Sequence, residues 1–261
     1  MGYGTLRYDA ADSGVARIEL DRPETRNALS DAVLDDLLAA LGEVRDDDAV
    51  RCVVIASTHP TTFSAGGDLA EFAAPAPLVV KHRGLDRFPR LFRALGELGK
   101  PSICAAGGHV LAGALGLALA CDLVVASEEA TFGTPEIHVG LFPFMVSALA
   151  YRNLPRKKVN ELLLLGERID AAEALRLGIV SRVVAPEELM TTVGALARRI
   201  AAGPPVAIRL AKHSLYANAD RDLKSALEGE TSAQNICFET EDAREGIRAF
   251  IEKRDPVFRG R

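Results

Sequence analysis

The chain of 261 residues is long enough for one large domain or two small ones with a substantial core. Its 48% apolar and 26% charged residues are ordinary for a globular protein, which excludes disordered and fibrous classes. The formal net charge is −5 and the basic residues are scattered, so we expect no nucleic acid as a main partner.

The N-terminal two thirds alternates predicted strands and helices. Short strands are expected at Leu6–Asp9 and Val15–Leu20, and Ser30 can cap a helix that follows. A helix rich in arginine and leucine is expected across Leu85–Leu98. Continuous apolar runs predict strands buried on both faces at Val50–Ala56, Ser102–Ala106 and Leu123–Ala126. Strand-then-helix units that recur in this way imply right-handed parallel crossovers, and therefore an α/β core.

Beyond residue 143 the pattern is mainly helical. Pro155 begins one helix, while Asp170 and Glu173 form a capping box for another that ends at Gly178. Long helical patterns then cover 187–201, 205–217 and 221–252.

The four cysteines form no CxxC pair, which favours buried, reduced thiols and gives no support for a metal site. The N-terminus carries no signal-peptide pattern. The least polar stretch, HVLAGALGLALACD (109–122), spans about a dozen apolar residues, fewer than the ~20 that a bilayer requires. We therefore expect a cytoplasmic protein with no membrane partner.

The stretch TFSAGGDL (62–69) follows a buried strand with small residues and precedes a helix-like segment. Small residues leave the backbone N–H groups of Ala65, Gly66 and Gly67 unshielded, which is how proteins build anion and oxyanion sites. The alternative is a tight turn in which Asp68 caps the next helix.

The stretch 109–122 repeats this arrangement, with a strand, a pair of glycines and a helix start. Glycine inside a helix costs up to ~1 kcal/mol relative to alanine. Gly113 and Gly116 therefore indicate close backbone approach, either to a ligand or to a packed neighbour. The glycine spacing does not fit G-x-G-x-x-G, so the dinucleotide fingerprint is absent.

The stretch FGTPEIHVGLFPF (132–144) places Glu136 among apolar residues. Apolar surroundings disfavour the ionised carboxyl and raise its pKa, which suits proton transfer near neutral pH. The alternative is a glutamate on a surface loop. His138 would share a face with Glu136 if the segment were a strand, although packing in the core or at the surface is the commoner fate.

Taken together, these stretches resemble the crotonase superfamily, the enoyl-CoA hydratase/isomerase fold. The motifs occur in family order along nearly the whole chain: DRPETRNALS (21–30), FSAGGDLAEF (63–72), ACDLVVAS (120–127), FGTPEIHVGL (132–141), GERIDAAEALRLGIVSRVV (166–184) and EGIRAFIEKRDPVFRGR (245–261). The resemblance implies an α/β spiral of β-β-α turns over residues 1–200. It also implies a C-terminal helical region over 201–261 that packs in trimers, often paired into hexamers.

Members of this family bind acyl-CoA thioesters and stabilise an enolate oxyanion with two backbone N–H groups. By motif, those donors correspond to Ala65 and Gly113, and the acid–base carboxylate corresponds to Glu136. The resemblance implies substrate-binding roles for Arg26, Ala28, Leu29, Ala65, Gly66, Gly67, Asp68, Leu69, Gly113, Phe250 and Lys253, the last two of which can contact a neighbouring subunit's CoA. It implies no metal and no separate cofactor, since coenzyme A is part of the substrate.

The sequence departs from the family's hydratases at one position. Hydratases use two glutamates to hold and activate water, and the first belongs three residues after the oxyanion glycine, where this chain has Gly116. With Glu136 alone, the simplest chemistry is a proton shuttle, Δ3–Δ2 enoyl-CoA isomerisation. The segment Phe142–Phe144 replaces a smaller, glycine-rich one and would keep the pocket dry. We therefore predict isomerisation over hydration, although hydratase is the nearer label by similarity.

Other functions stay open. The same oxyanion hole could serve thioester hydrolysis, decarboxylation or retro-aldol chemistry, and a non-catalytic acyl-CoA-binding relative would make no use of Glu136. An NAD-dependent oxidoreductase lacks its phosphate fingerprint here. A serine hydrolase would need a GxSxG motif, which the chain does not contain.

Overall fold

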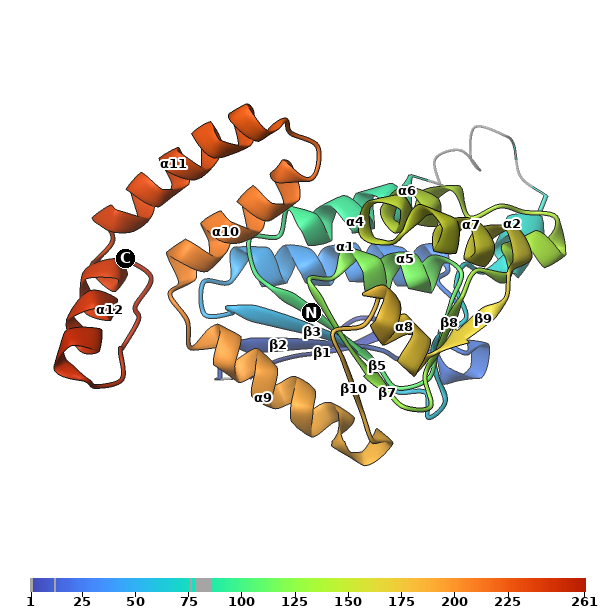
Figure 1. The fold of residues 1–261 in the computed structure, drawn as a ribbon. Helices are drawn as coiled ribbons and strands as arrows, with labels where there is room; N and C mark the ends of the chain where they lie inside the picture. Colours follow the sequence, from blue (N-terminus) through green and yellow to red (C-terminus); the bar gives the residue numbers. More distant parts are fainter. Residues whose placement is uncertain (1, 12, 76, 78–85) are drawn as a thin grey trace.

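The protein is described from a computed structural model in which residues 2–11, 13–75, 77 and 86–261 are placed (Figure 1). Two sheets organise these residues: a six-stranded sheet in the order β1-β2-β3-β5-β7-β10 and a four-stranded sheet in the order β4-β6-β8-β9. The large sheet consists of β1 (Leu6–Ala11), β2 (Val15–Leu20), β3 (Cys52–Ser57), β5 (Ser102–Ala106), β7 (Leu123–Ser127) and β10 (Arg182–Val184). The small sheet consists of β4 (Thr62–Ser64), β6 (His109–Leu111), β8 (Thr131–Gly133) and β9 (Arg168–Asp170).

The large sheet is parallel except for the antiparallel β1–β2 pair. Side chains along a strand alternate between its two faces. In β3, Val53 and Ile55 join the core cluster under α1 (Asp31–Asp46) and α4 (Arg87–Gly96), whereas Val54 joins the cluster under α9 (Leu189–Ala201). Helices thus cover both faces, which is the physical reason that these strands read as continuous apolar runs.

The small sheet positions the candidate site. Strands β4, β6 and β8 are parallel, while β9 is antiparallel to β8. Each of the three parallel strands ends directly before a new segment: β4 before the glycine loop and α2 (Leu69–Ala73), β6 before α5 (Gly113–Ala120), and β8 before the 3₁₀ helix η2 (Pro135–Val139). The carboxyl ends of parallel strands lie at one edge, so these three segments meet there.

The remaining helices follow η2, apart from the short 3₁₀ helix η1 (Pro23–Thr25). They are α6 (Phe144–Asn153), α7 (Arg156–Leu165), α8 (Ala171–Leu177), η3 (Pro186–Glu188), α10 (Pro205–Asn218), α11 (Leu223–Glu239) and α12 (Glu241–Glu252). In Figure 1, α11 and α12 extend away from the two sheets.

The predicted N-caps at Ser30 and Asp170 are confirmed, but the Glu173 carboxylate accepts from Arg176 rather than completing a capping box. The Ser30 hydroxyl accepts the Val33 N–H at 3.3 Å, and the Asp170 carboxylate accepts the Glu173 N–H at 2.8 Å. Gly178 ends α8 in the left-handed conformation, with φ of 84°.

Two of the predicted helices differ from the prediction in their extent or in their described bounds. The single helical pattern over 221–252 is two helices, because Thr240 is extended and its hydroxyl accepts the Ala243 N–H at 3.0 Å to cap α12. The arginine-rich helix is present as α4, but Leu85, its expected first residue, lies outside the described residues. Among the described residues, no helix combines the length and the apolar character needed to cross a membrane.

Candidate active site

The glycine loop after β4 lies directly against the start of α5. A Cβ built on Gly66 would come within 2.4 Å of the Ala112 Cβ and 3.2 Å of the Gly113 nitrogen, so only glycine fits there. The φ of Gly66 is 92°, which also favours glycine. The Ala112 N–H donates to the Gly133 carbonyl at 2.8 Å, which ties the start of α5 to the end of β8. The small sheet therefore brings the three glycine-containing stretches together.

The backbone N–H groups of the glycine loop differ in whether they are free. The Ala65 N–H donates to the Arg26 carbonyl at 3.0 Å, and the Gly66 N–H donates to the Ser64 hydroxyl at 3.1 Å. Gly67 N–H has no acceptor among the residues that the structure describes. The expectation that Ala65 supplies a free donor is therefore wrong, because a distant loop already accepts its proton; Gly67 is the free donor.

Gly113 offers a second free N–H at the first position of α5. Within the described part of the chain this N–H has no acceptor, as is usual for the first turn of a helix. Ala112, just before it, has φ of 54° and ψ of −129°, a conformation that is strained for a residue with a Cβ. This turn aims the N–H groups of the helix start outward, and the positive end of the helix dipole adds to their attraction for an anionic oxygen.

Two phenylalanine rings of α4 pack on the glycines of α5. A Cβ on Gly113 would lie 2.6 Å from Cε1 of Phe88, and a Cβ on Gly116 would lie 2.5 Å from Cζ of Phe92. Cγ2 of Val146 lies 3.2 Å from the same point at Gly116. The Cβ position of residue 116 is therefore occupied by an aromatic ring and a valine, so a side chain there would require Phe92 to move.

Glu136 is held in η2 rather than in a strand, so it and His138 do not share a strand face. Its Oε2 atom is buried and has no hydrogen-bond partner among the described residues, and burial raises the pKa of this carboxyl, with a smaller opposing effect from its own backbone N–H. The flanking Ile137, Val139 and Leu141 are themselves 38%, 56% and 46% exposed.

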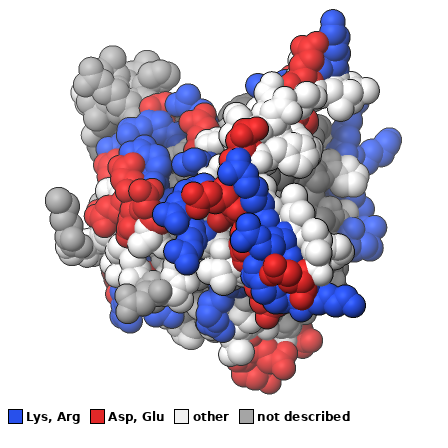
Figure 2. All heavy atoms as spheres, turned by 90° about the vertical axis from the view of Figure 1, so that its left-hand side faces the viewer, with Lys and Arg blue, Asp and Glu red and all other residues white. Residues whose placement is uncertain are grey.

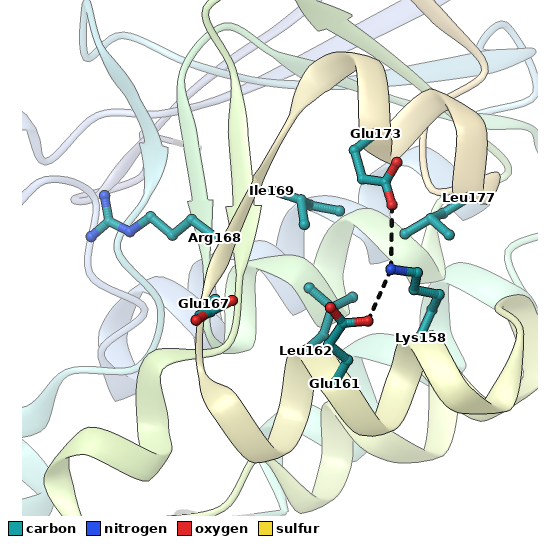
Figure 3. A pocket seen from close by; sticks show the side chains of 8 residues that line it. All are labelled: Lys158, Glu161, Leu162, Glu167, Arg168, Ile169, Glu173 and Leu177. Atoms are coloured by element: carbon teal, nitrogen blue, oxygen red, sulfur yellow. Dashed lines mark hydrogen bonds and ion pairs between the residues drawn. The ribbon is translucent and has the colours of Figure 1, made fainter.

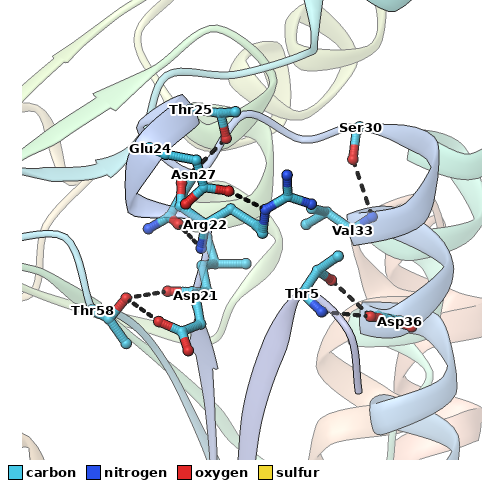
Figure 4. Close-up of polar contacts among 11 residues, drawn as sticks. Thr5, Asp21, Arg22, Glu24, Thr25, Asn27, Ser30, Val33, Asp36 and Thr58 are labelled. Atoms are coloured by element: carbon cyan, nitrogen blue, oxygen red, sulfur yellow. Dashed lines mark hydrogen bonds and ion pairs between the residues drawn. The ribbon is translucent and has the colours of Figure 1, made fainter.

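Asn27, which was not among the predicted site residues, lies beside Arg22 in the loop before α1 (Figure 4). Its side chain, only 1% exposed, accepts the Arg22 N–H at 2.7 Å and donates to the Ser57 hydroxyl at 2.7 Å and the Phe63 carbonyl at 3.3 Å. Its φ is 52°, and asparagine is one of the few residues that tolerate this region. An asparagine in a polar loop between two apolar segments was the available signal.

The other predicted binding residues of this region differ in their exposure and in the contacts that they make. Leu29 donates its N–H to the Gly66 carbonyl at 2.7 Å, but its side chain is 1% exposed and belongs to the core. Arg26 is exposed and Ala28 is half-buried beside it. Asp68 accepts the Ala70 N–H at 2.9 Å as the cap of α2, which was the alternative considered for it, and Leu69 is 52% exposed.

Phe250 and Lys253 are not brought to this site within one chain. Phe250 lies on α12 and is 85% exposed, and Lys253 ends that helix with φ of 54°. In Figure 1, α12 and α2 lie at opposite ends of the molecule.

Two further hollows hold mainly paired charges. A cavity of about 40 Å³ lies between α7, β9 and α8, where Lys158 Nζ lies 2.9 Å from a Glu161 oxygen and 3.9 Å from a Glu173 oxygen; Arg168 extends away (Figure 3). A groove of about 540 Å³ is lined by residues of α12 and of the C-terminal segment, where Arg261 pairs with Glu241 at 2.9 Å. Figure 2 shows acidic and basic side chains intermixed on the side of the molecule where α12 lies.

The chain matches a family of known proteins over nearly its whole length. The profile of the enoyl-CoA hydratase/isomerase family matches residues 10–261. A putative enoyl-CoA hydratase of Thermus thermophilus is 38% identical over 94% of this chain and 97% of its own length. A short-chain-enoyl-CoA hydratase of Clostridium acetobutylicum is 34% identical over 92% of each chain.

Solved structures agree with this match. An enoyl-CoA hydratase of Mycobacterium smegmatis superposes with a TM-score of 0.94 at 34% identity, covering 97% of this chain and 98% of the other. The fold that carries the three site segments is thus the crotonase fold. The chain belongs to the enoyl-CoA hydratase/isomerase family, the crotonase superfamily that its motifs predict.

Proposed function

We propose that this protein catalyses the Δ3–Δ2 isomerisation of an enoyl-CoA thioester, with Glu136 as the single acid–base group. One observation carries the proposal: Glu136 keeps a buried carboxylate oxygen without a partner, while the position of a second acid is Gly116, packed under Phe92. A carboxyl that is buried for structural reasons would normally be paired. An unpaired one in a segment that begins at the same sheet edge as the free N–H donors is typical of a site awaiting substrate.

In the proposed reaction the thioester oxygen accepts hydrogen bonds from the N–H groups of Gly67 and Gly113. The two bonds stabilise negative charge on this oxygen and so acidify C2. Glu136 removes a proton from C2 to form a dienolate and returns it to C4, so that the double bond moves from C3–C4 to C2–C3. No water is consumed and the carboxylate is regenerated. The raised pKa of Glu136 suits both halves of this transfer.

A second candidate is hydration of a 2-enoyl-CoA, which the names of the relatives favour. Hydration requires a held and activated water. The packing of Phe92 and Val146 against Gly116 opposes such a water in this chain. An acyl-CoA-binding protein without catalysis is a third candidate, but it gives no reason for a buried, unpaired carboxylate at Glu136.

We also propose that the chain works as a trimer or hexamer. Large apolar side chains are exposed on the C-terminal helices, and burial of such a surface against another copy would be favourable. They include Leu215, Leu223, Leu227, Ile236, Phe238, Ile247, Phe250 and Ile251, each more than half exposed. In such an assembly Phe250 and Lys253 of one subunit could approach the CoA of another. The cytoplasmic location stays a prediction.

The test compares one medium-chain acyl group supplied separately as the 3-enoyl and the 2-enoyl thioester. The wild type, Glu136→Gln and the surface control Glu129→Gln are assayed for isomerisation and for hydration. We expect isomerisation that falls at least ~10²-fold in Glu136→Gln and is unchanged in the control. Isomerisation that survives Glu136→Gln would refute the proton shuttle. Faster hydration than isomerisation by the wild type would establish the hydratase, and binding without turnover would establish the non-catalytic alternative.

A further inference from the structure

The ring of Phe88 lies against both of the proposed oxyanion donors. Its Cε1 is 2.6 Å from the Cβ position of Gly113, and its Cζ is in van der Waals contact with the Cβ position of Gly67 at 3.8 Å, where Cε2 of Phe72 is closer at 2.7 Å. Phe88 is 5% exposed, so the ring belongs to the apolar core rather than to the surface. The ring therefore contacts the Cβ positions of both residues that carry the proposed donors.

The start of α4, which carries Phe88, is anchored to α1. Arg87 makes a bidentate contact with Asp35, at 2.8 Å and 3.0 Å, and a third hydrogen bond with Asp31 at 2.9 Å. On its other side Phe88 packs against Phe92, with ring centroids 6.0 Å apart. The anchored start of α4 limits how far Phe88 can be displaced, because a well-packed core tolerates extra volume poorly.

From this geometry we infer that Phe88 restricts the substrate to acyl groups that are unbranched at C2. This inference rests on the proposed acyl-CoA site. C2 is bonded to the carbonyl carbon, so any group attached to it lies beside the oxygen held by Gly67 and Gly113. A methyl group there meets the ring of Phe88, whereas a methyl group at C3 lies one bond further away. One methyl group too many in an apolar pocket typically costs ~10- to 200-fold in affinity or rate.

The test measures binding of saturated thioesters, which cannot isomerise, by titration calorimetry. The ligands are butanoyl-CoA, 2-methylbutanoyl-CoA and 3-methylbutanoyl-CoA; the last two differ only in the position of the branch. The proteins are the wild type, Phe88→Ala, the milder Phe88→Leu and the matched control Phe92→Ala, which removes the same side chain one turn along α4. Thermal melting establishes which variants are folded.

For the wild type we expect the 2-methyl thioester to bind at least ~10-fold more weakly than the 3-methyl one. Phe88→Ala, or Phe88→Leu if the alanine variant does not fold, should reduce this gap to less than ~3-fold. Phe92→Ala should retain the gap. Equal binding of both branched ligands by the wild type, or equal loss of the gap in both alanine variants, would overturn the inference.

The outcome is separable from that of the proposed reaction. A wild type that shows the gap but does not isomerise 3-enoyl-CoA would refute the isomerase and leave the role of Phe88 intact. A wild type that isomerises but binds the branched ligands equally would do the reverse. A wild type that binds none of the three thioesters would overturn both.

Discussion

Replacement of Asn27 by alanine should loosen the loop that holds the glycine segment in place. The side chain bridges Arg22 to Phe63 and Ser57, while the Asn27 carbonyl accepts the Ser64 hydroxyl at 2.7 Å. Removal of the amide leaves the Arg22 N–H and the Phe63 carbonyl without this partner. Ser57 is less affected, because its hydroxyl still donates to the Thr62 carbonyl at 2.7 Å.

The magnitude follows from those two groups. A buried polar group left unpaired costs ~1–3 kcal/mol; the Phe63 carbonyl is buried but the Arg22 N–H is only half-buried, so the two losses total about 2–4 kcal/mol. Alanine at the positive φ of position 27 adds ~1 kcal/mol. For a domain of this size each kcal/mol lowers the Tm by ~2–4 °C, so Asn27→Ala should lower it by about 10 °C. Asn27→Gly removes the same hydrogen bonds without the φ penalty, so its Tm should fall slightly less.

Calorimetric melting and steady-state kinetics would test this together. The control is Asn153→Ala, since Asn153 is exposed and its side chain donates only to the Leu149 carbonyl at 2.8 Å. We expect no more than ~0.5 kcal/mol from that control. We also expect kcat/KM of Asn27→Ala to fall ~10²-fold, because a small displacement of the donors misplaces the substrate. Equal melting temperatures for Asn27→Ala and Asn153→Ala would refute the reasoning.

Three further perturbations test other parts of the site. Glu136→Gln should raise the Tm at pH 8, and this gain should fade toward pH 5. Burial raises the folded-state pKa of Glu136 above 4.5, so the wild type loses stability as the pH rises through that pKa, whereas the glutamine variant does not. A gain in Tm that grew toward low pH would contradict this. Gly113→Ala should lower the Tm, because overpacking against Phe88 costs ~1–3 kcal/mol and outweighs the gain of up to ~1 kcal/mol in helix propensity. The double variant Gly113→Ala with Phe88→Leu should recover part of this loss. Lys212→Met removes an amine that is 5% exposed and lies 2.6 Å from the Asp122 carboxylate, which is 37% exposed and stays in contact with water. In urea unfolding, the free energy of unfolding should therefore fall by about 1–2 kcal/mol rather than by the 3–5 kcal/mol of a fully buried pair.

The sequence by itself determined the features that depend on neighbours along the chain. The caps at Ser30 and Asp170 were predictable because a capping side chain contacts N–H groups only two or three residues ahead. The strands of the large sheet were predictable because burial on both faces produces continuous apolar runs. The absence of a carboxylate at Gly116 was read directly from the motif spacing.

Only the tertiary structure decided what depends on contacts between distant segments. Strands β4, β6, β8 and β9 have three residues each, too few to show any period, so the small sheet that gathers the site stayed hidden. Ala65 and Gly67 look equally free in the sequence. They differ because the Arg26 carbonyl, 39 positions before Ala65, accepts a hydrogen bond from the Ala65 N–H, whereas the Gly67 N–H stays available. Phe88 is likewise an ordinary helix residue until α4 packs on α5, since which space a side chain fills is set by its neighbours in three dimensions.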